Sequence, residues 1–115
     1  MLEKAALELL RDEPGKRYAI IGEMLELGVA GPRLHRELAD ACVGLDGVLC
    51  VGEGMRHLYD VLPDVQRLGF AARAENVDLD ALRSRLGKRS TVLVKGSNRV
   101  FWACDFLQRL RDAWA

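Results

Sequence analysis

The sequence predicts an α/β fold: a three-layer, Rossmann-like domain in which a mostly parallel sheet carries helices on both faces. Three observations support this prediction. Short apolar segments alternate with segments of helical periodicity along the 115 residues. The apolar segments are continuous instead of alternating with polar residues, which is typical of strands covered on both faces. Glycine or proline separates neighbouring segments, so the chain turns often between a strand and a helix.

The first half of the chain opens with a helix. Met1–Leu10 is rich in Ala, Leu, Glu and Lys, which favour helix, and a Pro-Gly pair follows soon after it. Arg17–Ile21 is a short apolar run, and we expect it to form a buried strand. A long loop then spans Gly22–Gly31. Pro32 suits the first turn of a helix, which we expect to run to about Val43, directly before a glycine.

The second half repeats the alternation, and glycine or proline punctuates it between elements. In order, we expect the strand Val48–Val51, the helix Met55–Leu62, the strand Leu68–Ala72, the helix Val77–Leu86, the β-branched strand Thr91–Val94 and the helix Arg99–Trp114. The chain as a whole begins with a helix, whereas a doubly wound domain usually opens with a strand. We therefore expect a first strand to be missing upstream.

Composition excludes several classes of protein. Lys+Arg and Asp+Glu both number 17, so the formal net charge is +0, without the basic excess expected of a nucleic-acid binder. No apolar run approaches the roughly 20 residues of a membrane span, and the N-terminus has no signal-peptide pattern. The three cysteines, Cys42, Cys50 and Cys104, are too widely spaced for a disulfide framework or a zinc site. We expect buried thiols, no metal site and a cytoplasmic location.

Two loops that follow strands carry the candidate chemistry. Glu23 and Glu26 bring carboxylates to the end of the first strand, where a cation or a ligand ammonium group could bind. Lys95, Gly96 and Ser97 follow the last strand, where a Lys charge and backbone N–H groups could bind an anion. The residues alone leave the alternative open that both loops are ordinary turns with solvated charges.

Other known motifs are absent. The chain has neither the GxGxxG dinucleotide pattern nor the GxxxxGK[ST] pattern of a P-loop. His35 and His57 are the only histidines, and neither pairs with a nucleophile or has a partner at metal-ligand spacing. No strand ends in Asp, which argues against a phospho-receiver domain. We therefore expect no catalytic residue within the chain.

The loop motifs together resemble a known family. They comprise Gly22-Glu23-Met24-Leu25-Glu26-Leu27-Gly28, then Leu34-His35, then Val48-Leu49-Cys50-Val51-Gly52, and finally Val92-Leu93-Val94-Lys95-Gly96-Ser97. In order and spacing, the set resembles the C-terminal domain of the bacterial Mur ligases, in the branch that adds D-alanyl-D-alanine to UDP-N-acetylmuramoyl-tripeptide. The resemblance implies that residues 1–115 are a single domain, cut from a three-domain enzyme of peptidoglycan synthesis.

The resemblance also implies the chemistry of the larger enzyme. A domain for the UDP-sugar and a central P-loop domain precede this one in the family, and the enzyme uses ATP and Mg. The candidate cleft residues that it implies here are Glu23, Met24, Glu26, Leu27, His35, Lys95, Gly96, Ser97, Asn98 and Arg99. Two positions depart from the family pattern, which usually has Asp at Glu23 and Arg at Asn98.

On this interpretation the chain alone is inactive and holds no cofactor, and its exposed edges could make it self-associate. It would close over the central domain and supply part of the pocket for D-alanyl-D-alanine. The alternative is a free-standing α/β module that binds a ligand or a partner at the same cleft without catalysis.

Overall fold

The computed structural model describes residues 2–23, 31–86, 90–95, 108–109 and 112. The helices are α1 (Leu2–Leu10), α2 (Gly31–Ala41), α3 (Arg56–Tyr59) and α4 (Leu79–Arg85), with the short 3-10 turns η2 (Glu53–Met55), η3 (Asp64–Gln66) and η4 (Ala74–Asn76). The strands are β1 (Lys16–Gly22), β2 (Gly47–Val51), β3 (Arg67–Ala71) and β4 (Ser90–Lys95). The predicted alternation of helices and strands is therefore correct.

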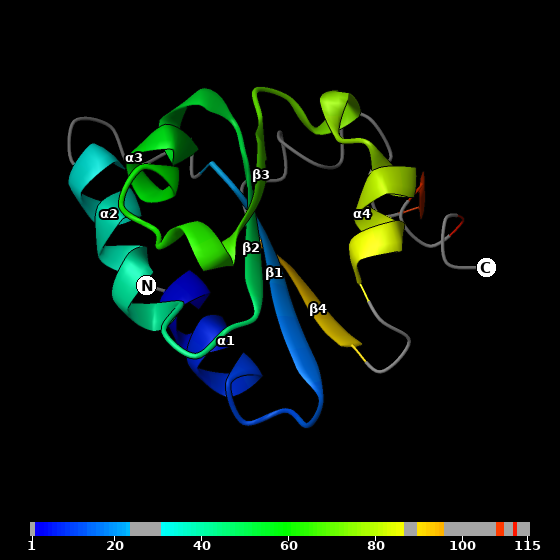
Figure 1. Ribbon diagram of the computed structural model, residues 1–115. Helices are drawn as coiled ribbons and strands as arrows, with labels where there is room; N and C mark the ends of the chain where they lie inside the picture. Colours follow the sequence, from blue (N-terminus) through cyan, green and yellow to red (C-terminus); the bar gives the residue numbers. More distant parts are fainter. Residues whose placement is uncertain (1, 24–30, 87–89, 96–107, 110–111, 113–115) are drawn as a thin grey trace.

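The four strands form one parallel sheet in the order β3-β2-β1-β4. Helices α1, α2 and α3 cover one face, and α4 covers the other, so the α/β fold with both faces covered is confirmed (Figure 1). The central strands β1 and β2 are buried along almost their whole length, whereas every residue of the edge strand β4 is half-buried.

Each face of the sheet has its own apolar core, because successive side chains of a strand point to opposite sides. From β1, Ala19 and Ile21 pack towards α1, α2 and α3. Tyr18 and Ile20 pack towards α4. The continuous apolar pattern of the strands follows from this two-sided burial.

Two predicted helices differ from the observed ones, and most of a third lies outside the described residues. The helix expected over Met55–Leu62 is a 3-10 turn followed by α3, which ends at Tyr59. The helix expected from Val77 begins later because the Asp78 side chain accepts a hydrogen bond from the Ala81 N–H at 3.0 Å and caps α4. Most of the helix expected over Arg99–Trp114 lies outside the described residues. Within that range, residues 108, 109 and 112 are described, and all three are helical.

Strand β3 contains an irregularity that the sequence pattern does not predict. Val48 pairs with Arg67 but Leu49 pairs with Gly69, so Leu68 is an extra residue on this strand. The bulge places Leu68 against the core on the α4 side, while Phe70 packs against the core on the opposite side. It therefore lets two apolar residues two positions apart, which share a face in a regular strand, reach different faces without breaking the parallel pairing.

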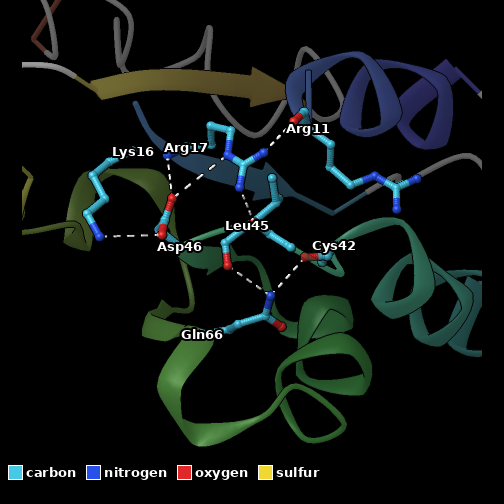
Figure 2. Close-up of polar contacts among 8 residues, drawn as sticks. Arg11, Lys16, Arg17, Cys42, Leu45, Asp46 and Gln66 are labelled. Atoms are coloured by element: carbon cyan, nitrogen blue, oxygen red, sulfur yellow. Dashed lines mark hydrogen bonds and ion pairs between the residues drawn. The ribbon is translucent and has the colours of Figure 1, made fainter. Parts of the chain in front are cut away.

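A polar network closes the amino end of the sheet (Figure 2). The Arg17 N–H donates to Asp46 Oδ2 at 2.8 Å, and the Asp46 N–H donates to the Arg17 carbonyl at 2.8 Å. The Arg17 guanidinium donates to the carbonyls of Arg11 and of Gly44, the latter at 2.7 Å. Buried Gln66 donates through Nε2 to the carbonyls of Cys42 at 2.8 Å and Leu45 at 3.1 Å. These contacts tie α1, the end of α2 and η3 to the start of β1.

Candidate functional site

The topology of the sheet marks one place as a ligand site. The chain passes from β1 to β2 to β3 in one direction and then returns to β4 on the other side of β1. Ligands of open α/β sheets bind outside the carboxyl ends of the strands, where the strand order reverses in this way. In this sheet the reversal lies between β1 and β4, whose carboxyl ends are aligned by the pairing of Ile21 with Lys95.

Lys95 lies directly at this switch point, as the last residue of β4. It is half-buried, and none of the other described residues forms an ion pair with it. A lysine ammonium group at the end of a strand can bind an anionic group such as a phosphate or a carboxylate. The anion-binding role that the sequence suggests for Lys95 stays a prediction.

Glu23 follows β1 at the same edge of the sheet, two residues after the partner of Lys95. Its side chain, however, is turned to the neighbouring loop after β2. Glu23 Oε1 accepts a hydrogen bond from the Gly54 N–H at 3.1 Å, and the Glu23 N–H donates to the Val51 carbonyl at 2.9 Å. The structure thus places Glu23 and Lys95 at one end of neighbouring strands but commits one carboxylate oxygen of Glu23 to the backbone.

The other candidate residues divide into two groups. His35 lies in α2 and is only 3% exposed, so its imidazole belongs to the interior and not to an open surface. Outside the described residues lie Met24, Glu26, Leu27, Gly96, Ser97, Asn98 and Arg99. The roles of these residues at a cleft stay predictions.

The described ranges contain no group of three or more His, Cys, Asp and Glu side chains that could hold a metal ion. Within the same ranges, no helix is both long and apolar enough to cross a membrane. Cys42 and Cys50 are both buried, and burial raises the pKa of each thiol to about 12. Both thiols are therefore protonated at neutral pH, which does not suit a nucleophile.

A pocket of about 240 Å³ lies between β3 and α4, on the face of the sheet that α4 covers. Most of its lining residues are apolar, and Asp78 and Arg85 also line it. Both charged residues already serve the fold: Asp78 caps α4, and Arg85 donates to the Leu68 carbonyl at 2.7 Å. The switch point therefore remains the better candidate for a functional site.

Sequence reasoning missed the two glycines that flank Glu53. Gly52 has φ +105°, and a Cβ atom there would lie 2.7 Å from the Glu23 Cβ. A Cβ atom at Gly54 would lie 2.3 Å from Glu23 Oε1. Two glycines spaced by one residue directly after a buried strand are the sequence signal that could have suggested a close approach by another group.

The fold defines a doubly wound α/β domain with a candidate ligand site at the carboxyl edge of its sheet. No protein-family profile matches the chain. Among curated proteins, the UDP-N-acetylmuramoyl-tripeptide–D-alanyl-D-alanine ligase of Rickettsia prowazekii is 36% identical over 100 residues, which are 84% of this chain and 22% of the ligase. The ligase of the same name from Escherichia coli is 32% identical over 95 residues, 81% of this chain and 21% of that protein. The chain therefore belongs to the Mur ligase family, as a relative of a domain-sized part of these D-alanyl-D-alanine-adding ligases.

A solved structure agrees with this assignment at the level of the fold. The MurF ligase from Thermotoga maritima, solved in complex with ADP, superposes with a TM-score of 0.76 and 24% identity. The match covers 98% of this chain and 26% of that one. The chain thus spans about a fifth of the length of the curated relatives that it matches.

Proposed function

We propose that this chain is the C-terminal, closing domain of an ATP-dependent ligase that joins D-alanyl-D-alanine to UDP-N-acetylmuramoyl-tripeptide in peptidoglycan precursor synthesis. The observation that carries the proposal is the similarity to two ligases of that name over more than four fifths of the chain. The location of Lys95 at the switch point of the sheet supports it, because a ligase of this kind handles phosphates and carboxylates.

In the reaction that we propose, ATP phosphorylates the terminal carboxylate of the tripeptide, and the amine of D-alanyl-D-alanine then attacks the acyl phosphate. A tetrahedral intermediate collapses to the new peptide bond and releases phosphate. Negative charge develops on oxygen in both steps, so a fixed cation beside the reacting groups lowers the barrier. Lys95 is the described residue that is best placed for this role.

The remaining machinery belongs to other domains of the longer protein. The chain contains no P-loop motif, and its described residues offer no cluster of side chains that suits a metal ion. Magnesium would neutralise phosphate charge when bound. We assign its ligands to the central domain. The N-terminal and central domains would be the partners of this chain, and the cytoplasm, where nucleotide-linked substrates occur, its location.

The test is an assay of the protein encoded by the whole reading frame that contains this chain. We expect release of ADP that requires both UDP-N-acetylmuramoyl-tripeptide and D-alanyl-D-alanine. A reading frame with no P-loop upstream of residue 1, or ADP release that does not depend on the dipeptide, would contradict the proposal. A reading frame without an upstream P-loop, together with ligand binding by the chain alone, would favour a free-standing binding module.

Two lysine variants of the same protein test the site. Lys95→Ala should lower kcat/KM by at least about tenfold, which corresponds to about 1.4 kcal/mol of transition-state stabilisation. Lys16→Ala is the matched control, because Lys16 lies on the neighbouring strand at the opposite end of the sheet and is 66% exposed. Its activity should stay within about twofold of the unmodified protein, a difference of about 0.4 kcal/mol. Equal effects of the two substitutions would refute the site.

A further inference from the structure

The side chain of Glu23 packs directly against two glycines, Gly52 and Gly54, in the loop after β2. A Cβ atom at Gly52 would lie 2.7 Å from the Glu23 Cβ and 3.0 Å from Oε2. A Cβ atom at Gly54 would lie 2.3 Å from Oε1 and 2.9 Å from Cδ. Real Cβ atoms do not approach other atoms this closely, so the side chain of Glu23 occupies space that only glycine leaves free at both positions.

The same contact joins the carboxyl ends of three strands. The Gly54 N–H donates to Glu23 Oε1 at 3.1 Å, and the Glu23 N–H continues the β1–β2 pairing by donating to Val51. On the other side of the loop, the Gly52 N–H donates to the Ala71 carbonyl at the end of β3 at 2.8 Å. The Glu23 carboxylate is therefore the side-chain part of a link from β1 through the loop 52–54 to β3.

We propose that Glu23 is a positioning residue, whose carboxylate holds the loop 52–54 against the end of β1 and so fixes the edge of the sheet beside Lys95. Its contribution to ligation rests on the proposed function, whereas the link itself is a property of the chain. The role differs from the one expected from sequence, in which the carboxylate binds a cation or an ammonium group of a ligand.

The two roles make different demands on the side chain. A positioning role needs an oxygen that accepts the Gly54 N–H, and the amide oxygen of glutamine accepts such a bond without carrying a charge. A ligand role needs the negative charge, which glutamine lacks. Glu23→Gln should therefore behave like the native residue if the link is what matters, and like Glu23→Ala if the charge is what matters.

A double-mutant cycle in the 115-residue chain tests the link directly. Gly54 is suited to it because its backbone does not require positive φ, unlike Gly52, and because the three atoms nearest to a Cβ there all belong to the Glu23 side chain. Gly54→Ala alone should raise the unfolding equilibrium constant, measured by urea denaturation, by about tenfold or more. In a Glu23→Ala background the collision partner is gone, and the same Gly54→Ala change should alter the constant by less than about threefold.

Glu53→Ala is the matched control, because Glu53 is an exposed acidic residue of the same loop. This substitution should change the unfolding equilibrium constant by less than about twofold. If Gly54→Ala alone fails to fold, folding of the double variant shows the same coupling. Equal effects of Gly54→Ala in the two backgrounds would overturn the link.

The functional part of the inference uses the longer protein and the ADP-release assay. At a temperature where all variants are folded, Glu23→Ala and Gly54→Ala should each lower kcat/KM by more than about tenfold, with the loss mainly in KM. Glu23→Gln should stay within about threefold of the native value. A Glu23→Gln protein as impaired as Glu23→Ala would overturn the positioning role. A longer protein with no ligation at all would instead refute the proposed function, while the cycle in the short chain still decides the link.

Discussion

The two ends of the sheet use their charged residues in opposite ways. At the amino end, Arg17 and Asp46 bond to each other's backbone, and the Arg17 guanidinium also binds the carbonyls that follow α1 and α2. At the carboxyl end, Lys95 has no ion-pair partner among the described residues. Polar groups at the amino end are thus bonded to the backbone, whereas at the carboxyl end the described residues offer Lys95 no ion-pair partner.

This difference has a physical basis. A buried or half-buried polar group is stabilising only when its hydrogen bonds are made, so the loops at the amino end gain rigidity from the bonds of Arg17, Asp46 and Gln66. A binding site needs groups that are still able to bond when the ligand arrives. Glu23 is intermediate, because one of its carboxylate oxygens is used by the Gly54 N–H. Substitutions at the two ends test whether the charged residues there differ in this way.

The largest effect should come from Gln66→Ala at the amino end. Gln66 is 9% exposed, and its loss removes two buried hydrogen bonds. The Leu45 carbonyl loses its Gln66 donor, whereas the Cys42 carbonyl keeps the bond from the Leu45 N–H at 3.1 Å. We expect a loss of about 3 kcal/mol in the free energy of unfolding, measured by urea denaturation. Gln108→Ala, which removes an exposed glutamine bonded to Asp112, should cost less than about 0.5 kcal/mol. A similar cost for both would mean that the amino-end network is dispensable.

Arg17→Ala should have the next largest effect. It removes two hydrogen bonds from a guanidinium to backbone carbonyls, at the ends of α1 and α2. Because the side chain is 25% exposed, we expect a loss of about 2 kcal/mol and not the full value of a buried charge. Lys16→Ala removes an exposed ion pair in which Nζ lies 3.7 Å from Asp46 Oδ1, and it should cost at most about 0.5 kcal/mol. Thermal unfolding of the two variants checks this, because the midpoint of Arg17→Ala should fall below that of Lys16→Ala.

Lys95→Ala should barely change stability, by less than about 0.5 kcal/mol, since no described group depends on its ammonium. Chemical denaturation of the 115-residue chain gives the value. A loss above about 1 kcal/mol would break the comparison, because it would make Lys95 part of the fold as Arg17 is. The same variant is expected to lose activity in the longer protein, so stability and activity should separate.

The smallest expected signal is nucleotide binding by the chain alone. It has no P-loop, and a single lysine at a strand end makes few contacts to a triphosphate. We expect a Kd for ATP weaker than about 1 mM, which is less than about 4 kcal/mol of binding free energy. Isothermal titration calorimetry is the measurement. Tight binding would mean that the carboxyl edge is complete without another domain.

Much of the fold could be predicted because it depends on local patterns. Continuous apolar runs such as Val48–Val51 fix the buried strands, and their burial on both faces requires helices on both sides. The positions of Glu23 and Lys95 at one edge also follow, since parallel strands end together. The strand order β3-β2-β1-β4 did not follow, because apolar strands carry no signal that identifies their neighbours.

The missed features all depend on contacts between residues distant in sequence. Gln66 looks like a polar loop residue, but it ends η3 and is buried, where it donates to the carbonyls of Cys42 and Leu45 after α2. Leu68 fits the strand pattern and still forms a bulge, because the pairing with β2 decides the register. The direction of the Glu23 side chain depends on two glycines more than 25 positions away in the chain. Such partners become visible only when the sheet is assembled.

The position of β4 beside β1 has a consequence for synthesis on the ribosome. Residues up to Ala71 suffice for β1, β2 and β3 with the three helices of one face, so this part can assemble early. One edge of β1 stays open until Ser90 and its neighbours emerge and pair with Lys16 onwards. We expect the nascent chain to be most prone to aggregation in that interval, because an unpaired apolar strand edge invites other strands. The strand that carries Lys95 is therefore also the one that covers the open edge of β1.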